Sequence, residues 1–422
     1  MNITPGVPRL PPYLRAGVAL VALVALTLGI PRESTAQAPV VVRSSEAPAW
    51  GTAVRLVEEL RIGVLDGDPD YVLGRVGQVA IGPNGQIIIA DDAAPALRVF
   101  DANGRFVRVI GRNGEGPGEY RSMGGVATLR DGRIQLWDNR IQRLTTYSAI
   151  GEYLGAVRVP SGLFSADLFH VDHEGFAYVR TTVGMPLPNE AWQFGWSRVS
   201  PDGVVLDTLK VPTSTFAAPS FVLSTPSGYD RPFPRELVST MSSRGALLVG
   251  DNRTYAFEQR RPGAATIRVE RAYQPIALLA EERTEWEAWA RMFEQQAANR
   301  PAAPKGVIGG GPRTVKYDIP RDKPPFSELD SDADGRIWVR RYAPAVYRKA
   351  PERAAGDKRP KREWREPPTY DVFLSDGKFL GTVVLPWNSR LEEAIGNQVW
   401  VTGTGEAGEE FVARYRIETG SR

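Results

Sequence analysis

A hairpin pattern that recurs six times constrains the fold of this chain more than any other feature. Each copy has an apolar run, a polar turn and an alternating strand, and the copies begin at Val79, Gly125, Leu168, Ser239, Glu328 and Leu391. The turn residues are Gly85, Gly132, Gly175, Gly245 and Gly335, with Asn397 in the last copy. Since Gly adopts a positive φ freely and Asn tolerates it best among the other residues, we expect a positive φ at each of these positions.

A second pair of apolar runs follows each core hairpin. In "LRVFDANGRFVRVIG" and "YDVFLSDGKFLGTVVLP" the two runs flank a short turn that contains Gly, which is the hairpin signal. Each copy is therefore a four-stranded antiparallel sheet. Successive turn residues are 47, 43, 70, 90 and 62 positions apart. The short spacings match the period of roughly 40–50 residues seen in propeller blades, and the long ones indicate insertions. The sequence predicts an all-β fold, a six-bladed β-propeller.

The two ends of the repeat region favour a closed ring. The sixth copy supplies only three strands, whereas an unpaired strand, Ala53–Gly63, precedes the first copy. Pairing that N-terminal strand with the last blade, near Phe411–Ile417, removes two exposed sheet edges. The alternative, two packed β-sandwiches, leaves the N-terminal strand without a partner.

The long spacings contain two insertions. In Glu281–Arg300 the residues Trp286, Trp289, Ala290 and Phe293 follow helical spacing, which predicts an amphipathic helix between blades four and five. We expect this aromatic stripe to pack on the propeller rather than to form a ligand box. The segment Tyr347–Pro368 is rich in Pro and in charge, which predicts a projecting hairpin or mobile loop in blade five.

The N-terminus has the order of a secretory signal peptide. Arg9 and Arg15 precede the apolar run Ala16–Ile30, and small residues follow, with a cleavage site after Ala36. The alternative is a retained anchor, but this run is shorter than the roughly 20 residues of a spanning helix. We expect a signal peptide at residues 1–36 and the propeller at 37–422. The mature protein is then secreted or periplasmic, without a membrane span, and monomeric.

Charge and composition exclude several function classes. Removal of the signal peptide lowers the formal net charge from +3 to +1, so the chain as a whole does not indicate a nucleic-acid partner. The basic segment Tyr347–Pro368 could suggest one, but in an exported protein a solvated loop is favoured. The chain has no Cys, which excludes disulfides, thiol catalysis and Cys metal sites.

The segment "RVIGRNGEGPGEYRSMGGVATLRDGRIQLWDNRIQRLTTYSAIGEYLG" resembles an NHL-type repeat. The chain as a whole is similar to the exported six-bladed β-propellers of bacteria in the NHL and TolB-like group. Within this segment, "GRNGEGPGEY" is followed by a strand rather than by a helix, so we expect a corner between blades and not a phosphate cradle.

The resemblance admits two kinds of function, since propellers host unrelated activities. The favoured expectation is a binding module that recognises a protein, peptide or glycan at the channel mouth or the top face. The alternative is a metal-dependent propeller enzyme of the lactonase or lyase kind. Catalysis is disfavoured because the only histidines, His170 and His173, are too few for a three-histidine zinc site, and His173 is expected to be exposed.

Equivalent positions on the innermost strands predict a ring of side chains around the channel. The position five residues before the turn residue is occupied, in blades one to six, by Ala80, Ala127, His170, Thr240, Asp330 and Glu392. We predict that His170, Asp330 and Glu392 bind a ligand, either a divalent cation or a cationic group. The alternatives are that these side chains turn into the interfaces between blades, or that the count is shifted by one residue in blades three and six.

Two acidic segments are candidates for a calcium ion or another divalent cation. "DSDADG" places Asp330, Asp332 and Asp334 as in the opening of a calcium-binding loop, but the position of the final Glu ligand is Arg341. A plain hairpin turn is therefore favoured. The second segment, "LDGDPDY", is favoured as a solvated loop.

Overall fold

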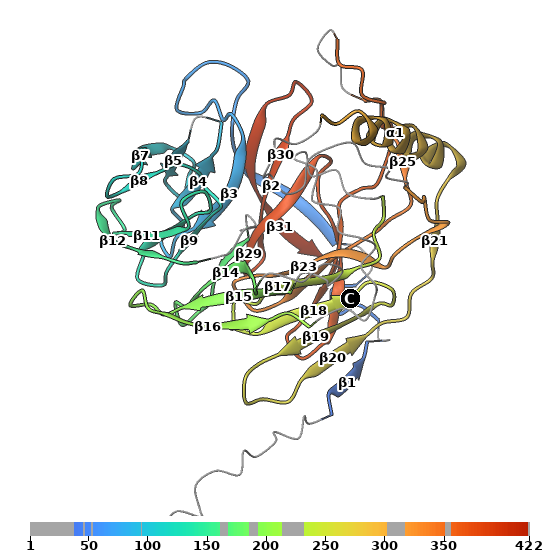
Figure 1. Ribbon diagram of the computed structural model, residues 1–422, viewed down its shortest axis with the longest axis horizontal. Helices are drawn as coiled ribbons and strands as arrows, with labels where there is room; N and C mark the ends of the chain where they lie inside the picture. The colour runs from blue at the N-terminus through green and yellow to red at the C-terminus, as the bar shows by residue number, and fades with distance from the viewer. Residues whose placement is uncertain are drawn as a thin grey trace, which may run out of the picture. The chain divides into compact units, whose positions relative to one another are not determined.

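The computed structural model describes residues 38–44, 47–51, 54–93, 95–160, 168–184, 193–212, 232–301, 317–350 and 356–420. The segment expected to be a signal peptide lies outside these residues. Residues Pro39–Arg422 form one compact unit that contains six antiparallel blades in a ring (Figure 1). The predicted all-β six-bladed propeller is confirmed. Within the described residues, no helix has the length and hydrophobicity needed to cross a membrane.

Each blade begins with its innermost strand. Blade one is β3 (Val76–Ile81), β4 (Ile87–Asp91), β5 (Ala96–Phe100) and β6 (Phe106–Ile110), and blade two is β9 (Gly125–Thr128), β10 (Ile134–Asp138), β11 (Arg143–Tyr147) and β12 (Tyr153–Arg158). Blade three is β13 (Phe169–Val171), β14 (Ala177–Thr182), β15 (Phe194–Val199) and β16 (Val205–Lys210), and blade four contains β17 (Leu237–Met241), β18 (Leu247–Asp251), β19 (Ala256–Arg260) and β20 (Ile267–Glu270). Blade five is β23 (Phe326–Ser331), β24 (Ile337–Arg341), β27 (Thr369–Phe373) and β28 (Phe379–Val384). Blade six is β29 (Ser389–Ile395), β30 (Gln398–Thr404), β31 (Glu410–Thr419) and the N-terminal strand β2 (Val54–Ile62).

The inner hairpin turns show why Gly recurs at this position. The turn glycines predicted to have a positive φ do so in blades one to five, with values from 71° to 87°. In blade six the prediction is wrong, because the positive φ of 58° falls on Gly396 and not on Asn397. Ile395 pairs directly with Gln398, so Gly396 is the first residue of a two-residue turn. Such a turn requires a positive φ at that place.

The N-terminal strand completes blade six. β2 pairs antiparallel with β31, from Val54 opposite Thr419 to Ile62 opposite Val412. Ile62 is buried in a cluster that includes residues of blades six and one. The last blade therefore joins the two ends of the propeller and covers the edge of β31.

One strand of the structure has no counterpart in the prediction of four-stranded blades. β1 (Val40–Arg43) adds parallel to β20 as a fifth strand on the outside of blade four. A run of four residues carries too little pattern to distinguish a strand from a linker, and its pairing with β20 is a long-range contact.

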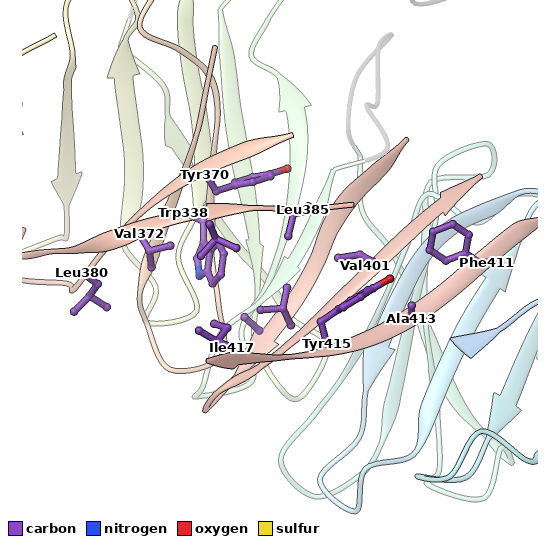
Figure 2. Packing of buried hydrophobic residues seen from close by; sticks show 13 residues of the cluster. Trp338, Tyr370, Val372, Leu380, Leu385, Val401, Phe411, Ala413, Tyr415 and Ile417 are labelled. Atoms are coloured by element: carbon purple, nitrogen blue, oxygen red, sulfur yellow. The ribbon is translucent and has the colours of Figure 1, made fainter. Parts of the chain in front are cut away.

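Apolar side chains from neighbouring blades fill the space between the sheets. Figure 2 shows one such cluster, in which Trp338 and Tyr370 of blade five pack in the same core as Val401, Phe411 and Tyr415 of blade six. The rings of Trp338 and Tyr370 meet edge to face with centroids 6.1 Å apart. Contacts of this kind hold each blade against the next.

The predicted helix is present, and it organises the second insertion. Helix α1 (Ala280–Ala298) lies between blades four and five and buries Trp289, Ala290 and Phe293 (Figure 1). The carboxylate of Glu285 accepts hydrogen bonds from the backbone N–H groups of Glu363 and Trp364, at 3.0 and 3.1 Å.

The second insertion contains a hairpin, one of the two forms predicted for it, and its described residues also contact the helix. β25 (Val346–Tyr347) and β26 (Trp364–Arg365) form a short hairpin, and the Arg362 guanidinium lies 3.6 Å from the ring centroid of Trp286. The composition of a segment gives its number of charged residues, but it does not show which groups those side chains contact.

A buried ion cluster joins both insertions to blade five. Lys323, in β22 (Asp322–Lys323), has a fully buried side chain whose Nζ lies 2.8 Å from Glu282 Oε1 and 2.6 Å from Glu366 Oε1. Nζ also donates a hydrogen bond to the carbonyl oxygen of Ala343 at 3.0 Å. Glu282 belongs to α1 and Glu366 to the second insertion, so one lysine links three segments.

Deletion of the closing strand tests its importance. Truncation of residues 1–63 should lower the free energy of unfolding by about 3–5 kcal/mol relative to truncation of residues 1–47, because only the longer deletion removes β2 and exposes the edge of β31. Both truncations lack β1, which makes them a matched pair. Urea unfolding measures the difference, and equal stability would show that closure by β2 is dispensable.

Removal of the buried lysine tests the ion cluster. Lys323→Ala should lower the free energy of unfolding by about 3–5 kcal/mol, since it leaves two carboxylates without their cation in the interior. Lys378→Ala, at an exposed turn of blade five, is the control and should change stability by less than about 0.5 kcal/mol. Comparable losses in the two variants, measured by urea unfolding, would contradict this assignment.

Candidate functional site

A cavity of about 690 Å³ lies where the innermost strands of all six blades meet. Each of the strands β3, β9, β13, β17, β23 and β29 contributes at least one residue to its lining. Because the first strand of every blade faces the axis, the cavity is a direct consequence of the ring.

The three residues predicted to bind a ligand all line this cavity. His170 comes from blade three, Asp330 from blade five and Glu392 from blade six. Within the part of the chain that the structure describes, no group of three or more His, Asp or Glu side chains lies close enough to hold a metal ion. The three side chains therefore share one cavity without forming a set of metal ligands there.

The imidazole of His170 is engaged with a neighbouring blade. Its Nε2 shares a hydrogen bond with Oγ1 of Thr240 at 2.9 Å, and its ring centroid lies 5.3 Å from that of Trp196. Burial lowers the pKa of His170 to about 4, so the imidazole is neutral at pH 7. His170 thus links blade three to blade four as an uncharged side chain.

Glu392 connects blade six to blade one. Its carboxylate accepts hydrogen bonds from the N–H of Val79 at 3.1 Å and from the hydroxyl of Thr402 at 2.7 Å, and it pairs with Arg390 at 2.6 Å. Gln78 bonds the N–H of Val126 in blade two in the same way, at 2.8 Å. Glu392 thus lines the cavity and also bonds to the neighbouring blade.

Glu393, which the sequence count misses, lies at the register position assigned to Glu392. It pairs with Trp400, as Asp330 pairs with Trp338, because the turn of blade six has only two residues between its paired strand ends, whereas that of blade five has five. Glu392 is the extra residue of a bulge between Leu391 and Glu393. Its carboxylate accepts the N–H groups of Ala333 and Ala394, and burial raises its pKa to about 8. The shorter Gly-Asn turn of blade six is the one signal that could have revealed the shift.

Asp330 differs from these engaged side chains. It lines the cavity half-buried, and its carboxylate accepts no hydrogen bond from any residue that the structure describes. Burial raises the pKa of Asp330 to about 7, and the negative charge of Glu328 adds to this effect, whereas Arg340 opposes it. A half-buried carboxyl group with a raised pKa and no partner within the fold is a candidate for a functional position.

The segment Asp330–Asp334 forms a hairpin turn, and the carboxylates of Asp332 and Asp334 both pair with Arg336. The buried carboxylate of Asp332 accepts the side-chain N–H of Trp338 at 2.7 Å and pairs with Arg336 at 2.5 Å. Asp334 also accepts the N–H of Gly396 at 2.7 Å. The strand β24 follows at once, so the segment lacks the remainder of a calcium-binding loop.

His173 lies where inner turns of neighbouring blades meet. It is half-buried rather than exposed as expected, because its Nε2 lies 2.6 Å from the carbonyl oxygen of Ala333 and its N–H donates to Ser243 at 2.8 Å. These bonds join the turns of blades three, four and five. At the opposite ends of the innermost strands the cavity lining includes Arg75 and Arg390.

Comparisons with known proteins agree with the fold. The family DUF5128, described as a 6-bladed beta-propeller, matches residues 64–209. A search of curated proteins finds no match. Among solved structures, a member of the DUF4221 family from Bacteroides vulgatus has a TM-score of 0.52 at 11% identity, covering 87% of this chain and 99% of its own.

Two further solved structures are more distant. A putative exported protein from Bacteroides fragilis has a TM-score of 0.47 at 11% identity, covering 90% of this chain and 99% of its own. Virginiamycin B lyase from Staphylococcus aureus has a TM-score of 0.41 at 11% identity, covering 87% of this chain and 100% of its own. At these identities the likeness concerns the fold alone.

The raised carboxyl pKa values predict how stability depends on pH. Folded Asp330 and Glu393 hold their protons to pH values of about 7 and about 8, whereas the unfolded carboxyls release them near 3.8 and 4.5. Their contribution is therefore lost progressively as the pH rises from about 4 to about 8, so the free energy of unfolding should fall over this range and level off above it. His170 opposes this trend only below about pH 6.5, where its unfolded form gains a proton.

Urea unfolding across this pH range provides the measurement. The double variant Asp330→Asn with Glu393→Gln should flatten the dependence, since neither amide titrates, whereas Asp376→Asn at an exposed turn should leave it unchanged. An equally steep decline in the double variant would show that other groups cause it.

Proposed function

We propose that this chain is an exported binding protein that recognises a protein, peptide or glycan ligand and admits one group of that ligand into the axial cavity. The observation that carries the proposal is the carboxylate of Asp330, which lines the cavity without a hydrogen-bond partner among the described residues. An acceptor left unpaired in the fold becomes available to a donor from outside it.

The chemistry of Asp330 favours a cationic group or a strong hydrogen-bond donor as the part of the ligand that enters. An ammonium group would favour the ionised form of Asp330 and would replace the water that burial removes. The hydroxyls of Ser243 and Ser331 also lie in the lining and offer further polar contacts. An amino sugar and a lysine side chain both carry such an ammonium group.

The geometry favours binding over the metal-dependent enzyme that was the alternative. Within the described residues no three-donor metal group is assembled. His170 Nε2 and the carboxylate of Glu392 already have hydrogen-bond partners on neighbouring blades. Of the three predicted residues, Asp330 is the one whose side chain makes no hydrogen bond with the described residues, and one carboxylate suits recognition better than acid–base chemistry with two partners.

Titration with small ammonium compounds tests this function. Glucosamine and the amide of Nα-acetyl-lysine represent the glycan and peptide classes, and calcium is titrated in parallel. We expect at least one ammonium compound to bind, with an affinity that falls about tenfold for each pH unit below about pH 7, because binding requires the ionised form of Asp330. Isothermal titration calorimetry at several pH values measures this dependence.

Substitution of the carboxylate supplies the control. Asp330→Asn should weaken binding about tenfold or more and remove the pH dependence, since a charge-assisted hydrogen bond is lost. Asp376→Asn should bind as the wild type does. Undiminished binding by Asp330→Asn would refute the role of this carboxylate, and binding of calcium alone would favour a metal site instead.

A further inference from the structure

A second hollow, of about 350 Å³, lies beside the axial cavity and is lined by residues from blades one and two. Its lining consists of Arg75, Asp92, Pro95, Asn113, Arg121, Ser122 and Arg140. Three of these seven residues are arginines, and one is a carboxylate. We refer to this hollow as the arginine pocket.

Two buried aspartates, one at the end of the second strand of each blade, position the backbone of these arginines. In blade one, Asp91 accepts the N–H groups of Gly74 and Arg75, each at 3.0 Å. In blade two, Asp138 accepts the N–H of Arg121 at 2.6 Å and that of Arg140 at 3.1 Å.

Both aspartates are 1% exposed, so the loops that they hold are anchored in the core. The blade repeat thus places Arg75 and Arg121 at equivalent points, just before the innermost strands of adjacent blades. Arg140 is held by the same carboxylate as Arg121. The positions of the three arginines therefore follow from buried hydrogen bonds and not from loop composition.

The charges of the pocket are incompletely balanced. Arg75 lies 3.9 Å from Asp92, a distance that brings charge attraction but no hydrogen bond. Arg121 pairs at 3.0 Å with Glu115, and both side chains are largely exposed, which makes this pair weak. Arg140 forms no ion pair with any residue that the structure describes. The arginine pocket therefore keeps a positive excess.

We propose that the arginine pocket binds an oxyanion, the carboxylate or phosphate group of a small molecule. Guanidinium groups present planar pairs of N–H donors that match the oxygens of both groups. Asn113 and Ser122 supply uncharged donors in the same lining. Since Arg75 and Asp92 also line the axial cavity, an anion held here lies next to that cavity. This site involves neither Asp330 nor the ligand proposed for it. The anion site and the proposed function can therefore be refuted independently of each other.

Calorimetric titration with inorganic phosphate and with malonate at low ionic strength, at about pH 8 where both are mainly dianions, tests the site. The two anions then have nearly the same charge but differ in geometry, so their relative affinities distinguish a phosphate site from a carboxylate site. Arg75→Gln, Arg121→Gln and Arg140→Gln should each weaken binding of the preferred anion roughly fivefold or more, and the triple variant should abolish it. Binding should also weaken as salt is added.

Arg105→Gln is the matched control. Arg105 is exposed, pairs with Asp101 in the outer turn of blade one and does not line the pocket, so its loss should leave binding unchanged. Thermal unfolding without anion checks that each variant is folded, and Arg140→Lys, which keeps the charge, should retain more binding than Arg140→Gln. The proposal is overturned if the wild type binds neither anion, or if Arg105→Gln weakens binding as much as Arg140→Gln does.

Discussion

The antiparallel pairing of β2 with β31 is the contact on which the rest of the ring depends. Without it, blade six would end at β31 and the apolar cluster between blades six and one would lose Ile62. The axial cavity exists because six innermost strands surround one axis, so its lining depends on closure as well. Closing a ring from both ends of a chain is a long-range contact, and its entropic cost is offset by burial of two sheet edges.

Polar side chains near the axis serve two purposes that residue type does not distinguish. Glu392, Gln78 and His170 use their polar atoms to join one blade to the next. Asp330 has the same kind of side chain on an equivalent strand, yet the described chain supplies it with no hydrogen bond. The partial desolvation of this half-buried carboxyl group is not compensated by the described residues, which is why we propose that a ligand supplies its partner.

The insertions show how charge can belong to the interior. Lys323 brings a helix and a hairpin together by pairing with one glutamate from each. Arg362 lies against the ring of Trp286 in the same region. Because these partners are distant in sequence, the composition of the second insertion alone predicts a solvated loop. In the structure, its charged side chains pair with groups of the helix and of β22, and the insertion packs as part of the domain.

The sequence by itself determined the six-bladed architecture, because the turn glycines and the alternating strands are local features set by φ preferences and by side-chain period. It also placed His170, Asp330 and Glu392 on innermost strands, hence near one cavity. Only the tertiary structure decided which of these side chains form hydrogen bonds with neighbouring blades. The short turn of blade six brings Glu393 to the ring position, and Glu392, the extra residue of the bulge in β29, bonds to blade one. Register and hydrogen-bond partners across blades arise from long-range packing, which no local pattern specifies.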